Sequence, residues 1–308
     1  MTRAGFQARV GQVNSATASA KAGAKPSLIA TSLLLPSYST VALELEGSTP
    51  TRKVEHMKAQ RIEGVIALVT GANRGIGRAL TEALLARGAR KVYAAARRPE
   101  SLGALHDARL VPLRLDVTCA DQIRTAVAAL SDVALVFNNA GVTLNTELAS
   151  ASLVERARCE MEVNYFGALQ LLQGFAPILA KNAGGALVNV GSVAGLSNIA
   201  FFPTYSASKA ALHSLTQAAR VLLGAQGTSV FGVYPGPVDT DMVRDLAMPK
   251  ATPGDVALAI LDGVEAGQED IFPDSFAQDF ARQFESSPKH AERQVAAMVA
   301  AMASGSAA

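Results

Sequence analysis

The sequence predicts an α/β fold, a doubly wound parallel sheet of about seven strands flanked by helices on both faces. Three observations lead to it. Short apolar runs, bounded by turn or polar residues, alternate with helical patterns from residue 65 onward. A glycine-rich turn directly follows the first of these runs, and no repeat or domain linker appears after residue 60. Because strands buried on both faces are apolar throughout, this alternation indicates a single domain built on a parallel sheet.

The predicted strands are short, and branched aliphatic or other apolar residues dominate them. In chain order they are Val65–Thr70, Lys91–Ala95, Arg109–Leu115, Ala134–Phe137, Gly185–Val190, Ser229–Tyr234 and, as a further short strand, Glu269–Phe272. Helical patterns fill the intervals between them. The predicted helices are Ile76–Arg87, Thr118–Leu130, Ser152–Ala180, Tyr205–Leu223 and the tail Ser275–Met302.

Local signals support several of these helices. Thr118 with Asp121 has the spacing of a capping box. Pro203 lies where the first turn of the helix that carries Tyr205 would begin. In the tail, one helix face bears an aromatic stripe that we expect to be core or subunit contact rather than a cofactor site. The stripe consists of Phe276, Phe280 and Phe284.

Composition narrows the class of protein. The 308 residues are 49% hydrophobic and carry a net charge of +2 with scattered basic residues, so neither nucleic acid nor an anionic membrane is an expected partner. Two cysteines, Cys119 and Cys159, exclude a disulfide framework and fit a reducing compartment. The four histidines show no metal-ligand spacing, so no metal site is expected. No apolar run approaches the roughly 20 residues of a membrane span, and we expect a cytoplasmic protein.

The first 60 residues differ in composition from the rest, and we expect them to be a disordered N-terminal extension to a domain spanning 61–308. Residues 1–43 contain no Asp or Glu and are rich in Ala, Ser and Thr. One interpretation is a translated leader upstream of a start at Met57. Another is an organellar transit peptide, which would make the protein organellar. A secretory signal fits less well, because a long charged stretch precedes the short apolar run.

The glycine-rich turn Thr70–Gly77 has the spacing G-x-x-x-G-x-G. Glycines let a pyrophosphate approach backbone N–H groups, and a helix N-terminus behind them favours negative charge. Alone, the motif could be an ordinary tight turn. Its place between the first strand and first helix of a Rossmann-like fold favours dinucleotide binding. The residues expected to contact the cofactor here are Gly71, Asn73, Arg74, Gly75, Ile76 and Gly77.

The end of the second strand indicates which dinucleotide binds. NAD sites place an acidic residue there for the ribose 2′-hydroxyl, but this strand ends in alanines followed by Arg97 and Arg98. An arginine can hold a 2′-phosphate through charge-assisted hydrogen bonds, and Arg97 and Arg74 are placed to do so. NADP(H) is therefore the predicted cofactor. The alternative is that Arg97 and Arg98 only solvate a surface turn.

Tyr205 and Lys209 lie four residues apart, on one face of a predicted helix. A free tyrosine has a pKa near 10, which makes it a poor proton donor or acceptor at neutral pH. A lysine and an oxidised nicotinamide nearby are expected to lower that pKa toward the working range. By itself the spacing is common, and an exposed helix-surface pair would be the safer interpretation.

Taken together, the motifs strongly resemble the short-chain dehydrogenase/reductase family over about Arg61 to Phe272. In family order they are Thr70–Gly77, Asp116-Val117, Asn138–Gly141, Asn164 in EVNYFG, Ser192 in VNVGSVAG, Tyr205 and Lys209 in YSASK, and Pro235–Thr240. Finding one such motif by accident is easy, whereas finding all of them in order is not.

The resemblance implies a catalytic role for four residues. Tyr205 would give a proton to the substrate's carbonyl oxygen on reduction and remove it on oxidation. Ser192 would hydrogen-bond the same oxygen and stabilise its charge. Lys209 would hold the cofactor's ribose hydroxyls and lower the Tyr205 pKa, and Asn164 would support a water in a proton relay.

The resemblance also implies cofactor contacts along the rest of the cleft. Asp116 would contact the adenine, with the Val117 backbone beside it. Asn138 would brace its strand under the ribose, and Gly141 would let the chain pass close by. Around the nicotinamide and ribose the expected contacts are Ala140, Pro235, Gly236, Val238 and Thr240.

These roles predict an NADPH-dependent oxidoreductase that interconverts an aldehyde or ketone and an alcohol by direct hydride transfer. Two segments would line an apolar substrate pocket, or else simply pack as a lid. Their apolar residues are Leu196, Ile199, Phe201, Phe202, Met242, Leu246 and Met248. A non-catalytic NADP(H) sensor of the same fold, and an epimerase or dehydratase on an extended scaffold, are the alternatives. Family members usually form homodimers or homotetramers through two long helices, here Ser152–Ala180 and Tyr205–Leu223.

Overall fold

One sheet of seven parallel strands organises the chain, in the order β3-β2-β1-β4-β5-β6-β7. The computed structural model describes residues 57–103, 106–144 and 149–303. The strands are β1 Ile66–Thr70, β2 Lys91–Ala96, β3 Leu110–Arg114, β4 Leu135–Asn138, β5 Ala186–Val190, β6 Ser229–Val233 and β7 Asp270–Ile271. Each predicted strand is found, displaced by at most one residue at an end. The predicted Rossmann-like fold class is confirmed.

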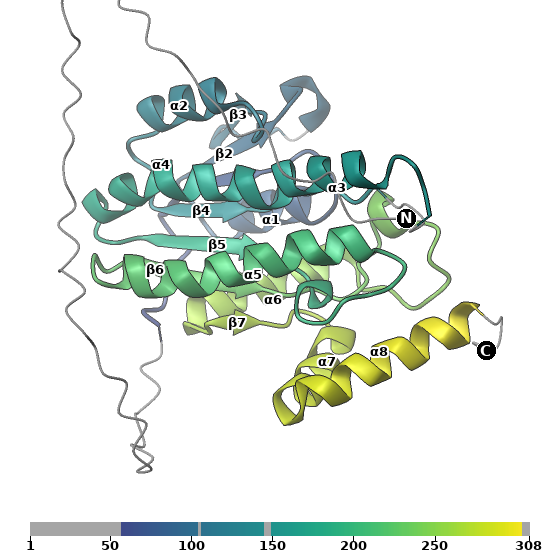
Figure 1. Cartoon of the computed structure of the whole chain (residues 1–308). Helices are drawn as coiled ribbons and strands as arrows, with labels where there is room; N and C mark the ends of the chain where they lie inside the picture. Colours follow the sequence, from purple (N-terminus) through teal and green to yellow (C-terminus); the bar gives the residue numbers. More distant parts are fainter. Residues whose placement is uncertain (1–56, 104–105, 145–148, 304–308) are drawn as a thin grey trace, which may run out of the picture. The chain divides into compact units, whose positions relative to one another are not determined.

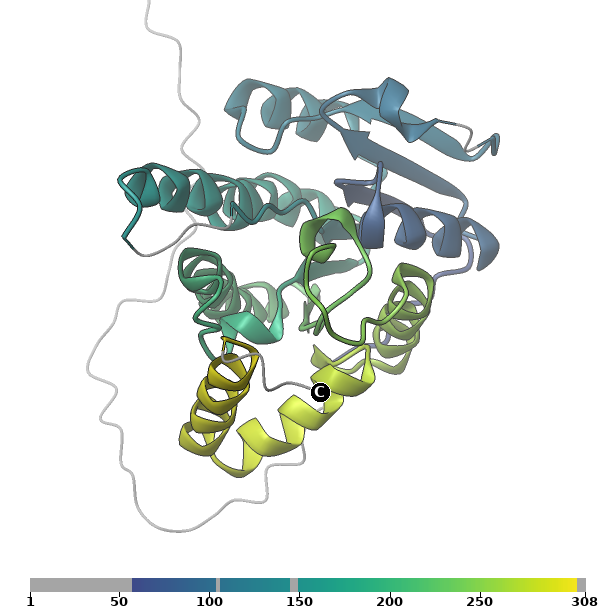
Figure 2. The same cartoon turned by 90° about the vertical axis from the view of Figure 1, so that its right-hand side faces the viewer.

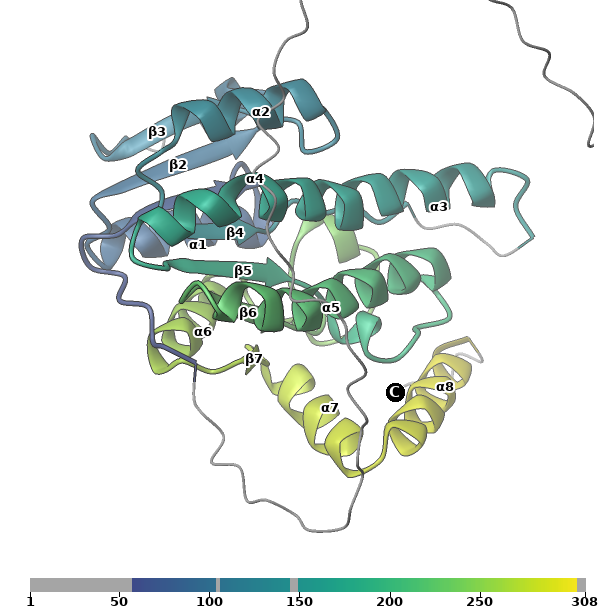
Figure 3. The same cartoon turned by 60° about the vertical axis from the view of Figure 1, so that its left-hand side comes forward.

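Helices cover both faces of the sheet. They are α1 Gly75–Ala86, α2 Ala120–Ala129, α3 Leu153–Met161, α4 Ala168–Lys181, α5 Pro203–Gly224, α6 Pro253–Ala266, α7 Ser275–Ser286 and α8 Pro288–Ala303. Short helical segments are η1 Pro99–Leu102, η2 Glu162–Gly167, η3 Val193–Gly195 and η4 Asp241–Val243. Helices α2, α4 and α5 lie on one face, with α1 and α6 on the other (Figure 1, Figure 3).

Successive side chains of each strand are buried on opposite faces of the sheet, so the apolar core has two parts, one on each face. In β1, Ala67 and Val69 pack with the α1 and α6 side, whereas Ile66 and Leu68 pack with the α2, α4 and α5 side. Successive side chains of a strand point to opposite faces, so an apolar run buried throughout needs helices on both. The sheet therefore rigidly places the loops that follow its strands.

Helices α7 and α8 follow β7 and lie beyond that edge of the sheet (Figure 1, Figure 2). They form a third apolar cluster with Val193 of η3 and Tyr234. Phe280 is buried in this cluster, and Phe276 and Phe284 pack against it. The aromatic stripe is thus part of a core, as predicted.

Helix α6 was not predicted, although its boundaries are marked in the sequence. The Thr252 hydroxyl accepts a hydrogen bond from the backbone N–H of Asp255 at 3.1 Å, and Pro253 occupies the first turn. Gly267 ends the helix in the left-handed conformation, with φ 71°. These are the usual start and stop signals of a helix.

Three predicted helix details are wrong. Thr118 does not cap α2; Cys119 occupies the N-cap position, and the Thr118 hydroxyl instead donates to Asp116 Oδ1 at 2.7 Å. The predicted long helix 152–180 contains a π-helical segment at Glu162–Gly167 between α3 and α4. The tail is two helices because extended Ser287 precedes Pro288, and a proline disfavours helical conformation at the residue before it.

The prediction for residues 1–60 concerns mainly residues 1–56, which lie outside the described residues. Of the next four residues, two make hydrogen bonds to the domain: Ser229 Oγ donates to the Lys58 carbonyl at 2.9 Å, and Gln60 N donates to the Val264 carbonyl at 3.1 Å. Among the helices that the structure describes, none is long and apolar enough to span a membrane.

Candidate active site

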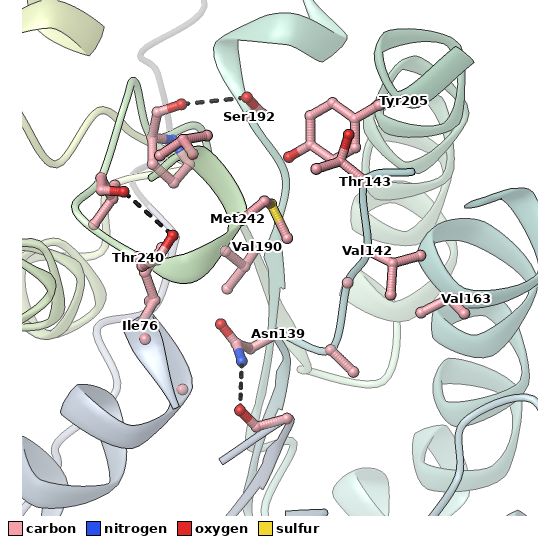
Figure 4. Close-up of a pocket in the computed structure, with 18 of the residues that line it drawn as sticks. Ile76, Asn139, Val142, Thr143, Val163, Val190, Ser192, Tyr205, Thr240 and Met242 are labelled. Atoms are coloured by element: carbon pink, nitrogen blue, oxygen red, sulfur yellow. Dashed lines mark hydrogen bonds between the residues drawn. The ribbon is translucent and has the colours of Figure 1, made fainter. Parts of the chain in front are cut away.

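A cavity of about 740 Å³ opens at the carboxyl ends of the strands, where the strand order reverses between β1 and β4 (Figure 4). Most residues predicted from the motifs line it. These are Gly71, Asn73, Arg74, Gly75, Ile76, Gly77, Arg97, Asp116, Val117, Ala140, Gly141, Ser192, Tyr205, Lys209, Pro235, Gly236, Val238 and Thr240. The two predicted residues that do not line it are Asn138 and Asn164.

The glycine turn brings strand β1 and helix α1 into a close approach that depends on its glycines. Gly71 has φ 66°, a conformation that residues with a side chain rarely adopt. A Cβ on Gly77 would lie 2.2 Å from the Gly71 carbonyl oxygen, so only glycine permits the tight approach of strand and helix. At the N-cap of α1, the Arg74 side chain makes no capping hydrogen bond. The first N–H groups of α1 therefore face the cavity as donors for an anion.

Asn139 was not among the predicted site residues, but it connects the glycine turn to the end of β4 through hydrogen bonds. Its Nδ2 donates to the Thr70 carbonyl at 2.8 Å, and its backbone N–H donates to Thr70 Oγ1 at 3.0 Å. Figure 4 shows its side chain in the pocket. Its position, first after the strand rather than last within it, is the signal that could have identified it.

Asn138 instead points into the core. Its Nδ2 donates to Asn189 Oδ1 at 2.9 Å, and Asn189 in turn donates to Thr216 Oγ1 of α5 at 2.9 Å. This buried chain of amides ties β4 and β5 to the helix that carries Tyr205. Asn138 thus braces its strand from beneath the cavity.

Ser192 and Tyr205 bring two hydroxyl groups into the same part of the cavity (Figure 4). Ser192 follows β5 as the N-cap of η3, where its Oγ accepts from Ala194 N at 3.1 Å and donates to the Pro235 carbonyl at 3.4 Å. Tyr205 lies in the first turn of α5, which begins at Pro203 as predicted. The two side chains lie in the same part of the cavity although they are thirteen positions apart in the sequence.

In the protein alone, the phenol of Tyr205 has a pKa raised to about 12, whereas the predicted lowering concerns the complex with an oxidised nicotinamide. Burial is the main cause, because it penalises the charged phenolate. A hydrogen bond with Ser192 acts in the opposite direction, and the negative charge of Glu160 adds to the increase. In the protein alone, the Tyr205 phenol is therefore protonated at neutral pH.

Lys209 lies one turn after Tyr205 and is buried, with 4% of its surface exposed. Its Nζ donates to the Val190 carbonyl at 2.7 Å and lies 5.8 Å from the centre of the Tyr205 ring. Burial lowers the Lys209 pKa to about 8. The pair is thus not an exposed surface pair, and the ammonium is held below the phenol by the end of β5.

Asn164 holds the loop after β4 against α5. Its Oδ1 accepts from Val142 N at 2.8 Å, while its Nδ2 donates to the Val142 carbonyl at 2.9 Å and to Ser208 Oγ at 2.8 Å. It lies in the π-helical segment η2, a type of distortion that is frequent at functional sites. Both the oxygen and the nitrogen of its side-chain amide are engaged in these hydrogen bonds.

At the other end of the cavity, charged groups surround the ends of β2 and β3. Arg97 and Arg98, which directly follow β2, are exposed, and residues 91–98 include no acidic residue. Asp116 Oδ1 accepts from Thr118 N at 3.0 Å, which shapes the turn after β3. Arg74 forms an ion pair with Asp241 of η4 at 3.3 Å, between two exposed side chains.

The segment Pro235–Thr240 is anchored by Asp274, which the sequence reasoning missed. Gly236 N donates to Asp274 Oδ2 at 2.8 Å, and Asp274 Oδ1 caps α7 by accepting from Ala277 N at 2.8 Å. An aspartate directly before a helical pattern is a common N-cap, so its capping role was detectable. Its second contact depends on tertiary structure.

The substrate end of the cavity is apolar. The predicted residues that line it are Ile199, Phe201, Phe202, Met242, Leu246 and Met248. Leu196 does not; it packs against the third apolar cluster instead, because η3 turns it toward α7 and α8. Phe276 of α7 and Met298 of α8 line the cavity and were not predicted to do so. Among the described residues, no group of three or more His, Cys, Asp or Glu could hold a metal ion.

Comparison with known proteins agrees with this geometry. A family model for short chain dehydrogenase matches residues 65–250. An uncharacterized oxidoreductase of Myxococcus xanthus is 39% identical over 186 residues, which cover 57% of this chain and 73% of that protein. The 3-oxoacyl-[acyl-carrier-protein] reductase FabG of Escherichia coli is 33% identical over 218 residues, covering 67% and 84%. A crystal structure of a short chain dehydrogenase from Burkholderia cenocepacia J2315 in complex with NADP has 39% identity and a TM-score of 0.73, covering 76% of this chain and 98% of that one.

Proposed function

The chain belongs to the short-chain dehydrogenase/reductase family, and we propose that it is an NADPH-dependent oxidoreductase that interconverts an aldehyde or ketone and an alcohol. One observation carries the proposal: the hydroxyls of Ser192 and Tyr205 lie in the same part of the cavity that the glycine turn lines (Figure 4). A non-catalytic sensor would need the glycine turn alone. A paired hydroxyl donor beside an apolar pocket supports catalysis.

NADP(H) fits the polar end of the cavity. The N–H groups of the glycine turn and of α1 would bind the pyrophosphate, and Asp116 would contact the adenine. Arg97 and Arg74 would bind the 2′-phosphate, since no carboxylate at the end of β2 opposes it. The NADP complex of the Burkholderia relative supports this choice. When bound, the cofactor supplies or accepts the hydride at the carbon of the substrate's carbonyl or alcohol group.

The chain's own groups would handle the proton. Ser192 would donate a hydrogen bond to the substrate oxygen and stabilise its developing negative charge. Tyr205, protonated at neutral pH, would donate its hydroxyl proton to that oxygen during reduction and take a proton from the alcohol during oxidation. Lys209 would hold the ribose hydroxyls from beneath, and Asn164 would keep the neighbouring loop in place for a water relay.

The substrate would be a small molecule with apolar substituents. Aromatic and methionine side chains line the substrate end of the cavity, from the segment between η3 and α5, from η4 and the residues after it, and from α7 and α8. Methionine is flexible and adapts to ligands of different shape. An aldehyde or ketone with an aliphatic or aromatic group is therefore the substrate class that suits this end of the cavity.

A homodimer or homotetramer is part of the proposal. Val221 and Leu222 on α5 expose 79% and 64% of their surfaces, and Phe166 of η2 is also exposed. Large exposed apolar side chains on the helices that cover one face of a sheet favour contact with another subunit. Light scattering tests this, and a stable monomer at micromolar concentration would contradict it.

The catalytic role of Tyr205 is tested with Tyr205→Phe. We expect the wild-type protein to consume NADPH with members of a panel of aldehydes and ketones. The variant should bind NADPH with an unchanged Kd but turn over about 100-fold to 10,000-fold more slowly, because the proton donor is gone. Equal turnover in the two proteins would refute the role. Tight NADPH binding without turnover on any member of the panel would favour the sensor.

A further inference from the structure

Glu160 carries a carboxyl group that the proposed function does not use. It lies in α3, four residues before Asn164, and only 1% of it is exposed. Its Oε1 accepts a hydrogen bond from Leu144 N at 2.8 Å. Its Oε2 is buried and has no hydrogen-bond partner among the described residues. Because a buried carboxyl group with an unpaired oxygen opposes folding, its presence suggests a functional reason.

The position of Glu160 relates it to Tyr205. Helix α3 packs against α5, and the two run side by side (Figure 1, Figure 3). Glu160 and Asn164 face the same way, because both side chains accept hydrogen bonds from the loop after β4. Asn164 reaches Ser208 of α5, and the Ser208 hydroxyl donates to the Tyr205 carbonyl at 2.7 Å.

Both residues also hold the loop after β4. Asn164 binds the backbone of Val142, and Glu160 binds the backbone N–H of Leu144. Arg156 Nη1, one turn earlier in α3, donates to the Leu144 carbonyl at 2.7 Å. Glu160 itself does not line the cavity. It can therefore act on the reaction only through its neighbours.

The charged neighbours of Tyr205 come from two elements. Glu160 belongs to α3, and Lys209 belongs to α5 and lies 5.8 Å from the phenol ring. The guanidinium of Arg156 bonds to the Leu144 carbonyl and to Ser152 Oγ, and no ion pair of Glu160 occurs among the described residues. The negative charge of Glu160 raises the pKa of Tyr205, in addition to the larger effect of burial.

We propose that Glu160 is a positioning residue of the active site, which fixes the loop after β4 and favours the proton-donating form of the neighbouring Tyr205. The inference rests on the proposed function, in which Tyr205 is the acid/base. In reduction the Tyr205 O–H bond breaks and its proton moves to the carbonyl oxygen as hydride reaches the carbon. In oxidation the alcohol proton must move to a phenolate. Glu160 would therefore extend reduction to higher pH and restrict oxidation to alkaline pH.

The test is a spectroscopic titration of Tyr205. The chain has five tyrosines and no tryptophan, so the ultraviolet absorbance of tyrosinate is unobscured by indole. Subtracting the titration of Tyr205→Phe from that of each protein isolates the Tyr205 signal. With NADP⁺ present at saturation, we expect Glu160→Gln to lower the midpoint by about one pH unit. The alkaline limit of the reduction rate should move by the same amount.

Two further variants separate charge from packing. Glu155→Gln removes an exposed carboxylate at the start of α3 and should leave the midpoint unchanged. Glu160→Asp keeps the charge and should stay close to the wild-type midpoint. If Glu160→Asp shifts as far as Glu160→Gln, packing is responsible and the inference is wrong. If the Gln variant does not fold, Glu160→Leu, which is apolar and of similar size, must show the same downward shift.

Failure of this inference is distinguishable from failure of the proposed function. An unchanged midpoint in Glu160→Gln, together with an inactive Tyr205→Phe, would eliminate the role of Glu160 alone. Full turnover by Tyr205→Phe would instead eliminate the acid/base role of Tyr205, whatever the titration shows.

Discussion

The two ends of the cavity are built in different ways. At the proposed cofactor end, consecutive residues of single loops, such as the glycine turn, line the cavity. At the substrate end, side chains from η3, η4, α7 and α8 converge from positions as distant as Ile199 and Met298. The residues of the cofactor end belong to local sequence motifs, whereas those of the substrate end are brought together only when the chain folds. The difference explains why cofactor chemistry can be inferred from a sequence more readily than substrate identity.

The largest expected effect comes from Gly77→Ala at the cofactor end. The new Cβ would lie 2.2 Å from the Gly71 carbonyl oxygen, so the turn would have to move and its N–H groups would lose their alignment. We expect NADPH affinity to fall about 100-fold or more in a fluorescence titration. Gly224→Ala, where a Cβ would meet no atom within 4 Å, is the control and should bind normally. Equal affinities would show that backbone geometry does not define this end.

A smaller and more selective effect is expected from Arg97→Ala. The variant loses charge-assisted hydrogen bonds to the 2′-phosphate, so its Kd for NADPH should rise roughly tenfold to a hundredfold. Its Kd for NADH should stay the same, since NADH has no such phosphate. Arg90→Ala, which removes an exposed arginine before the opposite end of β2, serves as the control. A wild-type enzyme with lower KM and higher turnover for NADH would contradict the assignment of Arg97.

The same contrast governs how much the sequence could predict. The seven strands, the glycine turn and the Tyr205–Lys209 pair carry local signals, and the structure has them where they were predicted. Asn138 and Asn139 are adjacent amides, and only the end of β4 decides which one faces the turn.

Burial is the other quantity that local patterns do not supply. A lysine four residues from a tyrosine suggests a lowered phenol pKa, but in the protein alone burial and the charge of Glu160 raise the pKa of Tyr205. Glu160 belongs to a helix 45 positions earlier in the chain. Its effect on Tyr205 depends on how α3 packs against α5, which no motif records.

The smallest expected effect is at the substrate end, with Met298→Ala. Met298 is a single flexible side chain of α8 in an apolar wall, and its loss enlarges the pocket without touching the hydroxyls of Ser192 and Tyr205. We expect the ratio of kcat/KM for a longer-chain ketone over a shorter one to rise about tenfold, since hydrophobic pockets discriminate methylene groups by only about 1–3 kcal/mol. NADPH affinity should not change. Arg293→Ala, exposed on the same helix, is the control. If Met298→Ala leaves the ratio unchanged while Gly77→Ala still abolishes binding, α8 is a structural cover, and specificity is determined by η3 and η4 alone.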